Sequence, residues 1–248
     1  PHEGGLGYMA GMFHLFTHAM FKALLFLCSG AIIVIIGSNF KQYMGGLHKY
    51  MPITNICFLI GCIAISGVWP LAGFFSKDEI VSACFEFSPF MGWFMTLVSG
   101  MTAFYMFRLY YVIFWGQSYY ELDPENRKKP GEVPFVMWGP LVFLAIISIF
   151  AGWIPFGHFV SATGQSMEIG LQHFEFTSVA WFSLLAAAIG IGLALCIVLG
   201  AEPSALGRFG AAILSAPNSA PLTPLPFTAT IVCVVFNACV RTHLSSPL

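Results

Sequence analysis

Three ionisable side chains, His14, His18 and Lys22, are spaced four residues apart in an apolar segment near the start of the chain. In an α-helix each step of four residues advances by about 400°, so these side chains follow one slowly drifting stripe. Histidine and lysine can both bind and release a proton, whereas a guanidinium stays charged. The spacing therefore indicates a proton path along one helix face, with Thr17 beside it to hold a bridging water.

Pro70 and Gly73, together with a second charged group of Lys77, Asp78 and Glu79, interrupt an otherwise apolar stretch. Ionisable groups at membrane depth are rare and usually mark ion or proton paths. Irregular backbone survives at that depth only where protein or water satisfies its polar groups, so the interruption predicts a broken helix. We expect Lys77 to carry a proton at a half-helix end, Asp78 to tune it, and Glu79 to be a cap or surface charge. The alternative is an ordinary interfacial cap at a helix start.

The segments that must position these residues are long and apolar. Of the 248 residues, 58% are hydrophobic and 8% are charged, against about 25% charged in an ordinary soluble domain. So few charges cannot cover a fold in water, whereas roughly 20 apolar residues suffice for one membrane crossing. The sequence predicts an all-α, polytopic transmembrane helical bundle with one broken helix. The predicted membrane segments are 6–36, 53–68, the broken segment 70–87, 90–115, 135–153 and 179–199.

The composition of the chain changes at about residue 200. We expect 1–200 to form a membrane domain of about six segments, and 201–248 to be a Pro/Ser/Ala-rich tail that is disordered or encoded in a shifted frame. If the crossings alternate and the broken segment counts as one, the Arg127–Lys129 connection lies opposite the connection that carries Lys41 and Lys49. The positive-inside rule then favours the Arg127–Lys129 side as cytoplasmic.

Charge and cysteine usage give no support to several other classes of function. A net charge of -1 provides no basic field for nucleic acid. The seven cysteines form no C-x-x-C pair and no zinc spacing with histidine, so we expect neither a metal site nor a bound cofactor. No phosphate-binding loop or nucleophile elbow is present, and no covalent catalytic site is expected. The chain starts at Pro1 without a signal peptide, which favours a downstream portion of a longer reading frame.

Two strings of sequence resemble a known family. HLFTHAMFKALLFL at 14–27 and AGFFSKDEI at 72–80 together closely resemble the large antiporter-like subunit of NADH-quinone oxidoreductase, which is subunit L in bacteria and chain 5 in mitochondria. The resemblance runs from about residue 7 to residue 199. Sister subunits and multisubunit sodium/proton antiporters share the first string, and the second points most toward subunit L.

The resemblance implies a proton-translocating membrane subunit in a bacterial plasma membrane or an organellar inner membrane. It implies that His14, His18 and Lys22 belong to a central hydrophilic axis, and that Lys77 with Asp78 belongs to an exit half-channel. The chain would be part of a translocase without a redox centre of its own. NADH, FMN, iron–sulfur clusters and quinone would belong to partner subunits, and the chain's own neighbours would be other membrane subunits and the lipid bilayer.

Two alternatives remain open at this stage. One is a subunit of a multisubunit sodium/proton antiporter, which neighbouring genes would distinguish from an oxidoreductase subunit. The other is a non-functional fragment or a purely structural membrane module. The family's upstream half, with its own broken helix and a Glu–Lys pair, is absent. Past Leu199 the family continues into charged sequence and a long amphipathic helix, whereas this tail is rich in proline and poor in charge.

Overall fold

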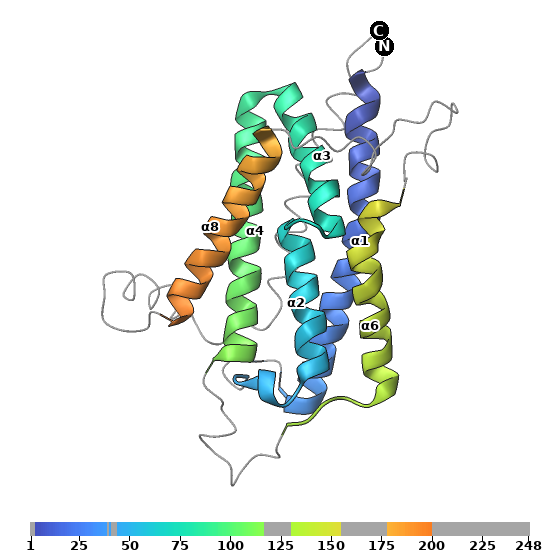
Figure 1. Cartoon of the computed structure of the whole chain (residues 1–248), viewed down its shortest axis with the longest axis vertical. Helices are drawn as coiled ribbons and strands as arrows, with labels where there is room; N and C mark the ends of the chain where they lie inside the picture. The colour runs from blue at the N-terminus through green and yellow to red at the C-terminus, as the bar shows by residue number, and fades with distance from the viewer. Residues whose placement is uncertain (1–2, 39, 41–43, 117–129, 155–177, 200–248) are drawn as a thin grey trace.

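The described chain is a bundle of α-helices, as predicted. The computed structural model describes residues 3–38, 40, 44–116, 130–154 and 178–199 (Figure 1). Within these ranges there are two short 3-10 helices, η2 (Leu47–Lys49) and η3 (Ala151–Trp153), and no strand. The α-helices are α1 (Glu3–Ile36), α2 (Pro52–Ser66), α3 (Ala72–Phe87), α4 (Pro89–Trp115), α6 (Phe135–Phe150) and α8 (Ser178–Leu199).

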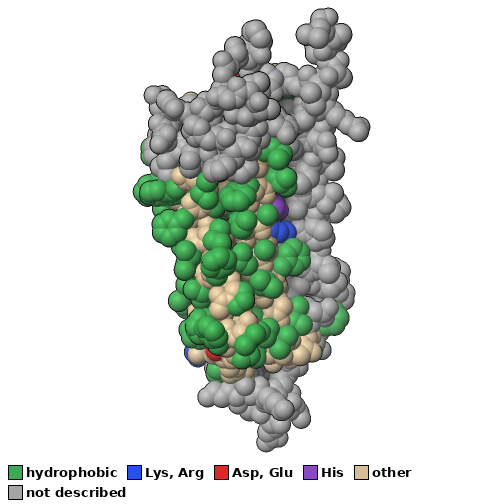
Figure 2. Space-filling model, turned by 90° about the vertical axis from the view of Figure 1, so that its right-hand side faces the viewer, with side chains coloured by type: hydrophobic (Ala, Val, Ile, Leu, Met, Phe, Trp, Pro, Cys, Tyr) green, Lys and Arg blue, Asp and Glu red, His purple; other side chains and the backbone are tan. Residues whose placement is uncertain are grey.

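The length and the surface of the helices show a multi-pass membrane protein. Large apolar side chains point outward, among them Phe90, Phe143 and Trp181, whose exposed fractions are 76%, 64% and 57%. Figure 2 shows one face of the molecule, on which hydrophobic side chains cover most of the described surface. Such a continuous apolar exterior requires lipid rather than water around it. The described helical stretches long and apolar enough to cross a membrane are Ala10–Ile36, Pro89–Trp115, Phe135–Trp153 and Ser178–Val198.

The broken helix is confirmed, but its limits differ from those predicted. α2 and α3 contain 15 and 16 residues, which is about 24 Å of helix each and too short for a hydrocarbon core of about 30 Å. Figure 1 shows them following one another along the bundle, so that together they span the length of α4. The predicted crossing 53–68 and the predicted broken segment 70–87 are therefore the two halves of one discontinuous crossing.

The break itself lies between Gly67 and Leu71, where the backbone leaves the α2 helix and enters α3. Gly67 adopts φ 74°, the left-handed conformation that glycine takes at many helix ends, and its N–H binds the carbonyl oxygen of Ala64. Lys77 and Asp78 lie within the continuous helix α3. The prediction that the charged cluster itself interrupts the helix is therefore wrong: a lysine and two carboxylates are compatible with helical backbone, and glycine and Pro70 are what end it.

The predicted sides of the two basic connections rest partly on Arg127–Lys129, which lie outside the described residues, but the flanking residues of both connections are described. His48, which follows α1, stacks on Trp115 at the end of α4 with ring centroids 4.4 Å apart. Glu132, just before α6, accepts hydrogen bonds from the N–H of Ile53 (2.8 Å) and the hydroxyl of Thr54 (2.6 Å) at the start of α2. The described flanks of both connections therefore adjoin one end of the bundle, and α2 and α3 make one crossing between them, not two.

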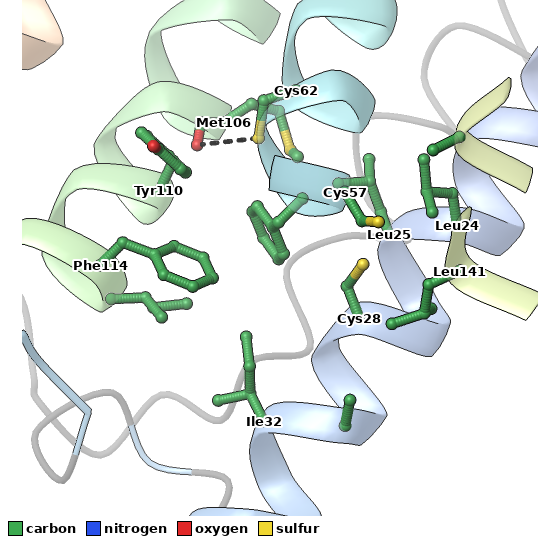
Figure 3. Close-up of a cluster of buried hydrophobic side chains, with 14 of the residues drawn as sticks. Leu24, Leu25, Cys28, Ile32, Cys57, Cys62, Met106, Tyr110, Phe114 and Leu141 are labelled. Atoms are coloured by element: carbon green, nitrogen blue, oxygen red, sulfur yellow. Dashed lines mark hydrogen bonds between the residues drawn. The ribbon is translucent and has the colours of Figure 1, made fainter. Parts of the chain in front are cut away.

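An apolar core holds α1, α2, α4 and α6 together in the half of the bundle next to that end. Its buried side chains include Leu24 and Cys28 of α1, Phe58 of α2 and Phe114 of α4. Figure 3 shows the sulfur atoms of Cys28, Cys57 and Cys62 turned into this cluster from α1 and α2. The cysteines therefore pack as small apolar side chains. The predicted tail 201–248 and residues 127–129 lie outside the described residues.

Candidate functional site

The stripe of basic side chains on α1 forms as the spacing predicts. The rings of His14 and His18 lie one turn apart with centroids separated by 5.7 Å. The next turn places Lys22 on the same side, with its Nζ 5.4 Å from the centroid of the Phe26 ring. All three basic side chains are half-buried. The helix therefore carries three proton-binding groups along one line, over two successive turns.

Ser76 of α3 connects this stripe to the broken helix. Its Oγ lies 3.1 Å from Nδ1 of His14 and accepts a hydrogen bond of 2.8 Å from the hydroxyl of Thr17. Ser76 and Thr17 are both fully buried, where a polar group requires a partner. Thr17 thus bonds directly to α3, where we had expected it to hold a bridging water. Sequence reasoning missed Ser76, although it stands next to Lys77 in the string that carried the resemblance.

Lys77 reaches back from α3 to the end of the preceding half-helix. Its Nζ donates a hydrogen bond of 3.2 Å to the carbonyl oxygen of Ile65, and its alkyl chain passes close to Gly67. The last carbonyls of a helix have no partner inside it and carry the negative end of the helix dipole. The N–H of Gly67 donates to the carbonyl oxygen of Ala64, and the N–H of Val68 donates to that of Ile63. The ammonium group of Lys77 therefore completes the C-terminal cap of α2.

A cavity joins the stripe on α1 to Lys77, and we call it the basic cavity. It offers about 40 Å³ to the centres of water molecules, against roughly 10–15 Å³ that one water requires. Its walls come from α1, the end of α2, α3 and α4. The lining residues are His14, His18, Phe21, Lys22, Ile65, Lys77, Ile80, Val81, Met95, Val98, Ser99, Thr102 and Tyr105.

The structure brings four of the five predicted site residues to this cavity and leaves the fifth outside. Asp78 does not line it. Asp78 is 6% exposed, and its Oδ1 has no hydrogen-bond partner among the described residues. No ion pair with Lys77 occurs in the part of the chain that the structure describes. The reason is geometric, because successive residues of a helix point about 100° apart.

The α4 wall of the cavity was not foreseen from the sequence. Ser99, Thr102 and Tyr105 contribute the only side-chain oxygen atoms among the lining residues. Their spacing of three residues places them along one side of α4 over about 9 Å. Isolated serine and threonine in an apolar helix are common, so no sequence signal separated these residues from Thr96 on the same helix.

These groups are suited to moving protons. Water in the basic cavity can exchange protons with lysine and histidine side chains that lie on its walls. The lining contains four nitrogen bases, and two of them are lysines: Lys22 on the continuous helix α1 and Lys77 on the half-helix α3. The arrangement therefore allows a proton to be held at either lysine and passed through water between them.

Residues 2–102 match the family model described as NADH:quinone oxidoreductase/Mrp antiporter, transmembrane. All the predicted site residues, and all lining residues except Tyr105, fall inside this range. The chain is also similar to curated proteins named NAD(P)H-quinone oxidoreductase chain 5. It is 41% identical over 223 residues to one from Picosynechococcus, covering 76% of this chain and 32% of that protein. It is 38% identical over 245 residues to one from Synechocystis, covering 77% and 36%.

A third relative is a chloroplast protein from Chaetosphaeridium globosum, named NAD(P)H-quinone oxidoreductase subunit 5. It is 44% identical over 159 residues, which cover 60% of this chain and 24% of the relative. The chain thus spans about a third of the length of the curated relatives that it matches. The family match over residues 2–102 includes the whole broken crossing and the basic stripe of α1.

Proposed function

We propose, from the premise that the chain belongs to the membrane family shared by NADH:quinone oxidoreductases and Mrp antiporters, that it carries part of the proton path of an NAD(P)H-quinone oxidoreductase. The observation that carries the proposal is the basic cavity, where His14, His18, Lys22 and Lys77 converge between four helices. Relatives named as chain 5 or subunit 5 of that oxidoreductase support this assignment.

In this proposal Lys22 and Lys77 hold the proton at the two ends of the path, and water in the basic cavity carries it between them. His14 and His18 are further groups that accept and return it. The bond from Lys77 to the Ile65 carbonyl, 3.2 Å long, holds a charged ammonium group at the break. When Lys77 loses its proton, the end of α2 loses that charge, so proton release and the conformation of the break are coupled.

Redox chemistry belongs to partner subunits in this proposal. NADH, FMN, iron–sulfur clusters and quinone would be bound there, and this chain would respond to their turnover by binding and releasing protons. Its partners would be the other membrane subunits of the complex. The chain then contributes to a translocase without carrying out electron transfer itself.

A sodium/proton antiporter is the second candidate, because the family model covers antiporters as well. The two functions differ in what drives the proton. In an oxidoreductase, proton uptake by membrane vesicles follows quinone reduction and needs no sodium gradient. In an antiporter, a sodium gradient drives proton movement without any quinone reduction. Vesicles containing the complete assembly distinguish these outcomes directly.

Replacement of Lys77 by alanine in the complete subunit tests the proposal. We expect proton uptake and coupled quinone reduction to fall together by about tenfold or more, because a positioned proton-transfer group contributes about 10²- to 10⁴-fold in rate. Lys49→Ala is the control, since Lys49 is an exposed lysine on η2 away from the cavity. Normal pumping in an assembled Lys77→Ala complex would refute the role.

A further inference from the structure

The α4 wall of the basic cavity differs chemically from the other walls. The histidines and lysines that line the cavity come from α1 and α3. The side-chain oxygens of the lining come from α4 alone, at Ser99, Thr102 and Tyr105. The cavity is therefore two-sided, with proton-binding groups on one side and hydroxyl oxygens on the other.

A protonated lysine needs acceptors, because its ammonium group carries three donors and no acceptor. For Lys77 the described residues provide one acceptor, the carbonyl oxygen of Ile65. The remaining N–H groups require water, or oxygens across the cavity. Leaving such donors without partners in an apolar environment would cost several kcal/mol. The cavity must therefore supply acceptors if Lys77 is to hold a proton.

Thr102 is set up to act as such an acceptor. Its hydroxyl donates its own hydrogen to the carbonyl oxygen of Val98 one turn earlier, over 2.8 Å. With the hydrogen fixed there, the oxygen lone pairs are what remains to interact with the cavity that Thr102 lines. Ser99 lines the same cavity one turn along α4 and is also buried.

We propose that Thr102, assisted by Ser99, is a positioning residue that holds water between Lys22 and Lys77 in the geometry required for proton exchange. This inference rests on the proposed function and extends it to a helix that carries no histidine or lysine in the cavity. The two hydroxyls bind the proton-carrying water, and the lysines and histidines bind the proton itself. Proton transfer between the lysines is then slowed when the acceptors are removed.

Thr96 provides a matched control on the same helix. It is 6% exposed, where Thr102 is 7% exposed, and its hydroxyl likewise donates to a carbonyl one turn earlier, that of Gly92 at 2.9 Å. Thr96 does not line the basic cavity. Replacement of either threonine by valine keeps the shape and removes the hydroxyl. The two substitutions therefore differ in whether the cavity loses an oxygen.

The experiment compares Thr102→Val, Thr102→Ser and Thr96→Val in the complete subunit within its assembled complex. We expect Thr102→Val to slow proton uptake per unit time by about three- to tenfold, the effect of losing one hydrogen bond, and to raise the solvent deuterium isotope effect on turnover. Thr102→Ser keeps the rate of proton uptake and the isotope effect normal, because serine retains the hydroxyl oxygen. Thr96→Val leaves both unchanged. Equal behaviour of Thr102→Val and Thr96→Val would overturn the inference.

Two further measurements keep the outcome clear. If Thr102→Val fails to assemble, Ser99→Ala probes the same wall with a smaller change, and normal proton uptake in Ser99→Ala then counts against the inference. Lys77→Ala is measured alongside. Loss of pumping in Lys77→Ala with normal pumping in Thr102→Val would reject the role of α4 alone, whereas normal pumping in Lys77→Ala would reject the proposed function.

Discussion

The helix α1 contributes to two neighbouring regions of the bundle, the basic cavity and the apolar core, which differ in polarity and in packing. Up to Lys22, the polar side chains on its inward side are His14 and His18, which line the basic cavity, and Thr17, which bonds to Ser76. From Leu24 onward its inward side chains are apolar and fully buried in the apolar core. One continuous helix thus lines the basic cavity in one part and the apolar core in the next.

The contrast teaches that close packing and the proposed proton path occupy different parts of the bundle. In the apolar core, phenylalanine rings such as Phe58 and Phe114 fill the space, with ring centroids 5.5 Å apart. In the basic cavity a discontinuous helix leaves backbone carbonyls and room for water. The apolar core fixes the relative positions of the helices, so that the basic cavity can remain incompletely packed without collapsing.

The largest effect is expected for Gly73→Ala, at the close contact between α3 and the end of α2. A Cβ at Gly73 would overlap the carbonyl oxygen of Ala64, and that backbone cannot move aside cheaply. We expect the free energy of unfolding to fall by about 3 kcal/mol or more, the upper end for overpacked sites, and pumping to be lost. Gly30→Ala is the control, because nothing lies within 4 Å of a Cβ there. Subunit assembly and thermal unfolding in membranes measure the difference, and equal values for the two variants would contradict the account of the break.

A smaller effect, confined to stability, is expected in the apolar core. Phe58→Ala removes a ring that is 1% exposed and packs against Phe114 and Tyr110. We expect the free energy of unfolding to fall by about 3 kcal/mol, which is the low end for a buried phenylalanine. The low end applies because the side chain faces lipid rather than water when the helices separate. Pumping per assembled complex stays normal. Phe90→Ala, on the lipid-facing surface, is the control. A Phe58→Ala complex that is stable but does not pump would break the separation of the two regions.

The smallest effect on stability is expected for Ser76→Ala, which, unlike Phe58→Ala, should impair proton uptake. This change removes the oxygen that contacts Nδ1 of His14 and accepts from Thr17. We expect stability to fall by about 1 kcal/mol, the worth of one hydrogen bond, and proton uptake to fall several-fold because His14 loses its orientation. Ser82→Ala, on the same helix but only partly buried, serves as the control. Unchanged proton uptake in Ser76→Ala would show that His14 needs no such support.

The sequence predicted the helical class and the stripe of His14, His18 and Lys22 because both depend on local spacing. It also identified Lys77, because a lysine in an apolar stretch stands out. The limits of the break could not be read in the same way, since Pro70 and the charged cluster were more conspicuous than Gly67. The break limits also set how many crossings the sequence analysis counted between the two basic connections, and Arg127–Lys129 lie outside the described residues.

The walls of the basic cavity could not be predicted because they depend on tertiary packing. Thr102 and Thr96 have similar apolar surroundings in the sequence, and the direction that α4 presents to α1 and α3 is what separates them. Asp78 was expected beside Lys77 because it is adjacent in sequence, but adjacent residues of a helix diverge. The domain limits at residue 200 and the origin of the tail stay predictions.

The most direct test of the central claim is the number of protons taken up per quinone reduced in vesicles that carry Lys77→Arg in the complete subunit. Arginine keeps the positive charge at the end of α2 but cannot release its proton. If Lys77 transfers protons, the arginine variant assembles and yet fails to pump, as Lys77→Ala does. If arginine pumps normally, Lys77 serves only as a fixed charge at the break, and the account of the basic cavity as a proton path is wrong.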